Sequence, residues 1–340
     1  MDYQYLADLS LVGDTPSRDQ CRAVLNSADK ELLSLINAAY RVRHHYFGNV
    51  VHIQVLTNAK SGLCQEDCHY CSQSRISQAE IERYPLMSKE NLLKEAKRAK
   101  QLKAKRYCMA LSGRNPSDKE IERLCDIIRA IKQEVGISVC CSLGFLSEEQ
   151  AKRLRAAGLD RVNHNLNTSQ RFHPQICTTH TYQDRVDTIT RCRGAGLEIC
   201  SGGIVGQGET DDDIVDLLMA VREIGADSIP INFLVPIKGT PFEDRGHDLN
   251  PRRCLKILCL ARFLNPDREI RVAGGREYHL RTLQPLAFYA ANSIFVTGYL
   301  TTPGQSAHEA WQMISDLGFE MEVEGMTDGE ESKRSAHLIA

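Results

Sequence analysis

Hydrophobic and polar residues follow two different periods along the chain. Up to about residue 47, apolar residues recur at mixed spacings of three and four, as at Leu32, Leu35 and Ile36, which predicts helices. From there to about residue 300, short β-type runs alternate with longer amphipathic stretches, the pattern of consecutive βα units around a parallel sheet. The predicted strands are Val51–Thr57, Lys105–Leu111, Gly136–Ser142, Leu159–Asn165, Leu197–Gly203, Asp227–Phe233, Arg268–Ala273 and Ser293–Thr297.

Eight such units over roughly 250 residues match the size of a closed barrel. We therefore predict an α/β fold, a (β/α)8 TIM barrel with an N-terminal helical extension, and keep a doubly wound open sheet as the alternative. The predicted domains are the extension at 1–47, the barrel at 48–300, a C-terminal helical segment at 301–325 and a polar, disordered tail at 326–340. Two helix starts carry capping-box residues: Ser147 with Gln150, and Thr210 with Asp213.

Composition narrows the classes of function. The 340 residues hold 42 Lys plus Arg against 44 Asp plus Glu, so no basic excess favours nucleic acid or a membrane surface as partner. The opening MDYQYLADLS lacks the features of a signal peptide, and no run approaches the roughly 18 apolar residues of a membrane span. We expect a cytoplasmic protein, in which 13 cysteines indicate metal or redox chemistry rather than disulfides.

Several predicted strands carry polar residues on one face, because side chains alternate between faces along a strand. Cys108, Cys140, Cys200 and Arg271 fall on this polar face in four different strands. If the apolar face packs on the surrounding helices, the polar face points into the barrel, where unpaired polar groups cost about 1 to 3 kcal/mol each. The interior is therefore expected to be a site, and three thiols beside an arginine favour a metal cluster.

The remaining cysteines outside the loop described next are expected to be inert fillers of the core, as buried free cysteines often are. Cys141 should face the helices. The others lie outside the predicted strands: Cys21, Cys125, Cys177, Cys192, Cys254 and Cys259.

A cysteine loop follows the first predicted strand. Cys64, Cys68 and Cys71 are separated by three and two residues, so one loop could wrap one metal centre. Structural zinc sites use four ligands, and only His69 lies nearby. An iron–sulfur cluster bound by three thiolates instead leaves one iron open for a reaction.

This loop, with Tyr70 directly before its last cysteine, resembles the signature of radical S-adenosylmethionine (SAM) enzymes. The resemblance implies a 4Fe-4S cluster on Cys64, Cys68 and Cys71 that binds SAM and generates a 5′-deoxyadenosyl radical. Within that superfamily, residues 50 to 300 resemble the biotin synthase family. The segments that carry this resemblance are GLCQEDCHYCSQS, RYCMA, VCCSLGFLSEEQAKRL, AGLDRVNHNLNTS, TTHTYQDRVDT, ICSGGIVGQGET, SIPINFLVPIKGTP, IRVAGGRE and ANSIF.

The biotin synthase resemblance implies an auxiliary iron–sulfur cluster that donates sulfur to dethiobiotin. Its ligands fall on the four residues that strand alternation places inside: Cys108, Cys140, Cys200 and Arg271. The cluster is commonly 2Fe-2S, but the segment MALSGRNP and the neighbouring Cys141 leave a larger cluster open. Arginine is an unusual iron ligand, so Arg271 could instead hydrogen-bond cluster sulfide.

The resemblance also implies roles for residues at the mouth of the barrel. Asn163 and Asn165 contact the substrate and the adenosyl ribose, and Asn232 assists at the substrate. Tyr70, Asn167, Arg185, Gly203 and Gly206 belong to the SAM site, with Arg185 at the methionine carboxylate.

The implied partners are dethiobiotin, flavodoxin or ferredoxin as electron donor, the iron–sulfur assembly machinery, and a second copy of the chain in a homodimer. Two other functions stay open. One is another radical SAM reaction on a different small molecule, and the other is a non-catalytic iron–sulfur carrier or zinc-stabilised scaffold.

Overall fold

Eight parallel strands close into a barrel in the computed structural model, which describes residues 1–62 and 64–322. The barrel closes through β1, which pairs with both β2 and β9. Gln54 of β1 lies opposite Arg106 of β2, and His52 of β1 lies opposite Ser293 of β9. The predicted (β/α)8 barrel is confirmed, and the open doubly wound sheet was the wrong alternative. The strands are β1 Val50–Lys60, β2 Arg106–Leu111, β3 Ser138–Ser142, β4 Arg161–Asn163, β5 Glu198–Cys200, β6 Gly203–Val205, β7 Ser228–Phe233, β8 Glu269–Val272, β9 Ser293–Val296 and β10 Glu320–Met321.

Each predicted strand overlaps an observed one, but the first is longer than predicted, and two strands, β5 and β6, both paired with β7, stand where the fifth was predicted. The break at Ser201 and Gly202 lies beside Pro230 of β7, which has no backbone N–H to donate. A Cβ at Gly202 would lie 2.0 Å from the Pro230 carbonyl oxygen, so only glycine fits this close approach.

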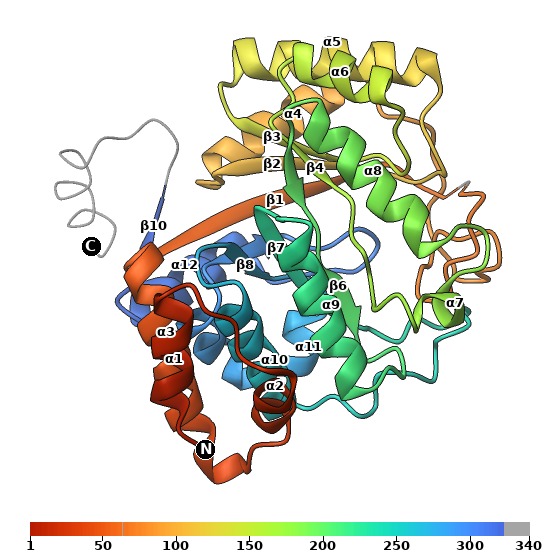
Figure 1. The fold of residues 1–340 in the computed structure, drawn as a ribbon. Helices are drawn as coiled ribbons and strands as arrows, with labels where there is room; N and C mark the ends of the chain where they lie inside the picture. The colour runs from red at the N-terminus through yellow and green to blue at the C-terminus, as the bar shows by residue number, and fades with distance from the viewer. Residues whose placement is uncertain (63, 323–340) are drawn as a thin grey trace, which may run out of the picture.

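Helices surround the barrel and also form the N-terminal extension (Figure 1). In the extension, α1 and α3 lie side by side, and α2 and α3 pack against α10. The α-helices are α1 Tyr3–Leu11, α2 Arg18–Leu25, α3 Leu32–Phe47, α4 Lys89–Gln101, α5 Asp118–Glu134, α6 Glu148–Ala156, α7 His173–Ile176, α8 Tyr182–Gly194, α9 Asp211–Glu223, α10 Pro251–Leu264, α11 Arg276–Leu280 and α12 Ala307–Asp316; the 3₁₀ helices are η1 Asp29–Glu31 and η2 Arg281–Tyr289.

Capping boxes fix the starts of several barrel helices. The hydroxyl of Ser147 accepts from the Gln150 N–H at the start of α6, and Thr210 does the same with Asp213 at α9, as predicted. Each of these helices follows a βα loop at the carboxyl ends of the strands, which we call the mouth of the barrel. The capping boxes therefore fix the point at which each of these loops ends.

The two faces of the strands pack into separate clusters. Met109 and Cys141 belong to the main core between strands and helices, as predicted for the outward face. Cys108 and Cys140 belong instead to a small buried cluster with Ala273 and Phe295. The sequence-based assignment of inner and outer faces is confirmed for these strands.

The C-terminal part contains α12 and the short β10, which pairs with the start of β1. The predicted tail at 326–340 lies outside the described residues, and the proposed domain boundaries stay predictions. No helix within residues 1–62 and 64–322 is both long and apolar enough to cross a membrane.

Candidate active site

A cavity opens at the carboxyl ends of the strands, where active sites of (β/α)8 enzymes lie. Its lining joins the cysteine loop to the predicted mouth residues. The predicted site residues in its wall are Cys64, Cys68, Tyr70, Cys71, Asn163, Asn165, Asn167, Arg185 and Asn232.

The cysteine loop is held in shape by local hydrogen bonds. The Cys71 N–H donates to the Cys68 carbonyl (3.1 Å), and the Ser74 N–H donates to the Cys71 carbonyl (3.1 Å). At the start of the loop, the Gln73 side-chain oxygen accepts from the Gly62 N–H (2.9 Å). These turns direct all three predicted thiols to one cavity.

Burial raises the pKa of Cys71 to about 11 and also raises the pKa of Cys64, so neither thiol ionises readily alone. A bound metal supplies the positive charge that stabilises such thiolates. Three thiols in the wall of a cavity that continues past them fit a cluster whose fourth iron takes a ligand from that cavity.

Asn163 and Asn165 connect the mouth to the interior. The Asn163 side-chain nitrogen lies 3.2 Å from both the Asn165 side-chain oxygen and the Cys200 sulfur. The same oxygen of Asn165 accepts from the Gly202 N–H (3.1 Å). The two amides are therefore fixed in orientation by the chain itself.

Asn167 and Tyr70 form a second pair across the cavity, with the amide of Asn167 donating to the Tyr70 hydroxyl at 2.5 Å. Asn167 has a φ of 72°, a left-handed conformation that asparagine tolerates better than most residues. Arg185 on α8 is buried and donates to the Asn165 carbonyl (2.9 Å), while its Nε has no hydrogen-bond partner among the described residues. A buried cation with a free donor suits an anionic group such as a carboxylate.

Asn232, Gly203 and Gly206 differ from these residues. The Asn232 amide already bonds two backbone groups, donating to the Gly203 carbonyl (3.0 Å) and accepting from the Gly274 N–H (2.9 Å). Gly203 and Gly206 do not line the cavity; Ile204 between them does. The direct role of the two glycines in binding SAM stays a prediction.

The interior residues come together below the mouth. Cys108 and Cys140 are direct neighbours in the β2–β3 register, and Arg271 Nη1 lies 3.5 Å from the Cys200 sulfur. A hydrogen bond with Cys108, together with burial, raises the pKa of Cys140 well above its usual value. Thiols next to a buried guanidinium fit an anionic cluster, because the arginine balances charge without itself being deprotonated.

Two protein-family models match the chain. The radical SAM superfamily model matches residues 60–221, and the biotin and thiamin synthesis associated domain matches 230–320. The chain is 51% identical to biotin synthase of Bacillus subtilis (strain 168), covering 93% of this chain and 94% of that protein. It is 49% identical to biotin synthase of Bacillus cytotoxicus, covering 95% and 97%. The chain belongs to the biotin synthase family.

A solved structure of methylornithine synthase matches with a TM-score of 0.81 at 20% identity, covering 93% of this chain and 97% of that one, which shows a shared fold. As a member of the biotin synthase family, the protein is a radical SAM enzyme. The family also implies a 4Fe-4S cluster and SAM as its cofactors.

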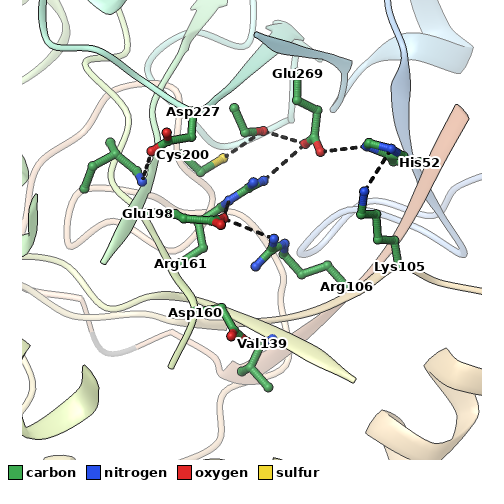
Figure 2. A network of polar contacts seen from close by, with 12 residues as sticks. His52, Lys105, Arg106, Val139, Asp160, Arg161, Glu198, Cys200, Asp227 and Glu269 are labelled. Carbon is green, nitrogen blue, oxygen red and sulfur yellow. Dashed lines mark hydrogen bonds and ion pairs between the residues drawn. The ribbon is translucent and has the colours of Figure 1, made fainter. Parts of the chain in front are cut away.

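Beneath the interior cysteines, this biotin synthase family member has a buried network of charges, shown in Figure 2. Glu269 lies at its centre and contacts Arg161 (3.3 Å) and His52 (3.1 Å) on opposite sides. Glu198 then joins Arg161 (2.9 Å) to Arg106 (3.2 Å). The network spans strands from both halves of the barrel and fills the lumen below the thiols.

Glu269 is also the partner of Arg271. The two side chains form an ion pair, and the hydroxyl of Ser228 bridges them, donating to Glu269 (2.6 Å) and accepting from Arg271 (2.8 Å). Burial alone would raise the pKa of Glu269, but the charges of Arg271 and Arg161 hold it well below its usual value. Glu269 therefore stays ionised and fixes the guanidinium beside Cys200.

Sequence reasoning missed Glu269 and its partners His52 and Arg161, although Glu269 shares a strand face with the predicted Arg271. It also placed Cys177 among the inert core fillers; Cys177 does lie in a buried apolar cluster, but its sulfur has polar neighbours as well. The Cys177 sulfur lies 3.8 Å from the Cys68 sulfur, 3.2 Å from His180 Nδ1 and 3.0 Å from an Asp67 carboxylate oxygen. The sequence feature that could have drawn attention to Cys177 is its short spacing from His180, which lies three residues later and is also a potential metal ligand.

Proposed function

We propose that the protein inserts sulfur into dethiobiotin to form biotin. In this proposal Cys64, Cys68 and Cys71 bind the 4Fe-4S cluster, and Cys108, Cys140, Cys200 and Arg271 bind the auxiliary cluster that donates the sulfur. The observation that carries the proposal is the position of Arg271 Nη1, 3.5 Å from the Cys200 sulfur inside the barrel of a biotin synthase family member.

When bound, the cofactors would supply two 5′-deoxyadenosyl radicals, each from one SAM and one electron and each taking one hydrogen atom, and a sulfide that bonds to both carbons while the cluster iron takes up one electron per bond formed. The chain's own residues position and enclose the reactants. Arg185 offers its buried guanidinium to the methionine carboxylate, and Tyr70 with Asn167 offers hydrogen-bonding groups to the adenosyl ribose.

Asn163 is the link between the two halves of the site. Its amide contacts both Asn165 at the mouth and the Cys200 sulfur in the lumen, so a ureido ring bonded to Asn163 would lie beside the sulfur donor. Phe295 and Tyr299, whose ring centroids are 5.4 Å apart, pack in the cluster that contains Cys108 and Cys140 and give the lumen an apolar wall. Such a wall excludes water and other hydrogen donors from a radical.

The wider setting belongs to the same proposal. Flavodoxin or ferredoxin supplies the electrons, the iron–sulfur assembly machinery rebuilds the auxiliary cluster, and the protein works in the cytoplasm as a homodimer. Whether the auxiliary cluster is 2Fe-2S or larger is decided by iron and sulfide counts on the purified protein.

The test is product analysis under anaerobic conditions. Protein loaded with iron and sulfide, then given SAM, dethiobiotin and a reductant, is expected to form both 5′-deoxyadenosine and biotin. Deoxyadenosine without biotin would indicate another radical SAM substrate. Metal-free protein that takes up no iron and sulfide on anaerobic reconstitution would contradict the cluster assignment.

A further inference from the structure

Three metal-binding side chains meet beside the cysteine loop, and two of them, Cys68 and His180, also line the cavity. Cys68, Cys177 and His180 are all buried, and their ligand atoms all lie within 4.8 Å of one another. Cys177 and His180 belong to the connection between α7 and α8, so two chain segments more than 100 residues apart contribute to the group. Neither Cys177 nor His180 has a role in the proposed reaction.

The spacing of these atoms suits a tetrahedral metal. A zinc ion with Zn–S bonds of about 2.3 Å holds two sulfurs roughly 3.8 Å apart. The sulfurs of Cys68 and Cys177 are 3.8 Å apart, and His180 Nδ1 is 3.2 Å from the Cys177 sulfur. An Asp67 carboxylate oxygen lies 3.0 Å from the same sulfur and accepts its hydrogen bond, which orients the Cys177 side chain.

The group is held in place by its own surroundings. The backbone N–H groups of Thr178 and Thr179 donate to Asp67 at 2.9 and 3.2 Å, which fixes the segment that follows Cys177. Little rearrangement is then needed for binding, since the ligands are already gathered.

In this structure the Glu66 carboxylate lies 2.5 Å from His180 Nδ1, the nitrogen that would bind the metal. It would keep two other partners if a metal took that nitrogen, because Thr179 Oγ1 (2.5 Å) and Arg114 Nη1 (2.8 Å) also contact its carboxylate. Displacement of Glu66 from the imidazole therefore leaves no charge unpaired.

We propose that Cys68, Cys177 and His180 form a zinc site that competes with the 4Fe-4S cluster for Cys68. On zinc binding the two thiols release their protons to solvent, the imidazole is the third ligand, and a water from the cavity that Cys68 and His180 line completes the tetrahedron. One thiolate cannot serve both centres in this arrangement, so zinc on these ligands and the cluster on Cys64, Cys68 and Cys71 exclude each other. The competition rests on the proposed function, whereas the zinc site itself does not.

The first test uses the full-length protein freed of metal under anaerobic conditions and titrated with zinc alone. One tight site per chain is expected, and Co²⁺ as a probe should give the visible absorption of tetrahedral thiolate coordination. Cys177→Ser should weaken binding by more than about 100-fold, since it removes a direct ligand. Cys64→Ser, which alters only the cluster loop, and Cys192→Ser, a buried cysteine on α8, should bind zinc like the parent.

The second test follows competition. Zinc-loaded parent protein is expected to take up iron and sulfide more slowly than metal-free protein, and Cys177→Ser should abolish that delay. His180→Asn serves as a second ligand variant, and far-UV circular dichroism establishes that each variant folds.

Zinc binding that is lost in Cys64→Ser but kept in Cys177→Ser would place zinc on the cluster loop and overturn the proposal, as would absence of binding to the parent. Tight zinc binding in a protein that forms no biotin would instead contradict only the proposed function.

Discussion

The mouth and the lumen of the barrel both gather cysteines, but they do so in opposite ways. At the mouth, Cys64, Cys68 and Cys71 come from one loop whose turns are local, and they line an open cavity. In the lumen, Cys108 and Cys140 meet only because β2 and β3 pair in the correct register. A local motif is therefore sufficient for the first set, whereas the second depends on the entire barrel.

The charged groups around the mouth cysteines also differ from those around the lumen cysteines. The mouth offers neutral amides and the guanidinium of Arg185 to exchangeable ligands, while Arg114 in the same wall is paired with Glu66. The lumen is closed below by the buried network around Glu269, which holds Arg271 beside Cys200. The mouth is thus built for exchange of small molecules, and the lumen for a fixed anionic group.

The largest expected effect separates the two cysteine sets. In the proposed function Cys64→Ala removes a ligand of the cluster that cleaves SAM, so we expect cleavage to fall by more than about 100-fold. Cys140→Ala leaves the mouth intact and should spare part of the cleavage while stopping biotin formation. Deoxyadenosine and biotin are quantified in the same anaerobic assay, and equal loss of both products in the two variants would argue against separate clusters.

A second prediction concerns the charges below the lumen cysteines. Glu269→Gln leaves Arg271 and Arg161 without their buried counter-ion, which costs on the order of 3 kcal/mol of unfolding free energy. Urea unfolding measures this loss, and Glu148→Gln, which removes an exposed ion pair on α6, provides the matched control. A Glu269 variant as stable as that control would show that the network does not support the lumen.

Smaller effects are expected from single amides at the mouth. Asn167→Ala removes one hydrogen bond to Tyr70, worth about 1 kcal/mol, so the KM for SAM should rise about fivefold with little change in kcat. Steady-state kinetics with varied SAM measure this, with Asn91→Ala on the exposed face of α4 as control. An unchanged KM would remove Asn167 from the SAM site.

The smallest prediction is a pH effect at the base of the lumen. Burial lowers the pKa of His52, but hydrogen bonds with Glu269 and Glu322 outweigh it, and the net shift is upward. The resulting stability is complete below the unfolded value of about 6.5 and is lost as pH rises through the raised folded value. Because Glu322 is half exposed, the loss should stay under about 1 kcal/mol.

Urea unfolding between about pH 6 and 9 measures that loss. His52→Gln should remove this part of the pH dependence, since glutamine does not titrate. The same slope in parent and variant would mean that another group causes it.

The alternation of side chains along each strand predicted from the sequence which cysteines face the lumen. It placed Cys108 and Cys140 inside and Cys141 outside, because each strand is flanked by helices on one side only. It could not identify the partners of Glu269, since pairing across the lumen depends on barrel register. Cys177 was missed for a similar reason: its neighbour Cys68 lies 109 positions away, on another loop.

The glycines show a further limit of sequence reasoning. Gly203 and Gly206 lie in a glycine-rich segment that suggested close approach to a ligand. In the structure a Cβ at Gly203 would lie 2.3 Å from Leu217, and one at Gly206 would lie 2.6 Å from Leu249. Packing between neighbouring elements is sufficient to require glycine there, which sequence alone does not distinguish from ligand binding.

The central claim is that the loop and the lumen hold separate clusters. The most direct test is Mössbauer spectroscopy, with iron and sulfide counts, of a reconstituted variant in which Cys64, Cys68 and Cys71 are all alanine. If the two cysteine sets hold separate clusters, this variant should lose the iron and sulfide of one 4Fe-4S cluster per chain and keep an iron–sulfur cluster in the lumen. Loss of all bound iron and sulfide from a folded variant would contradict that claim.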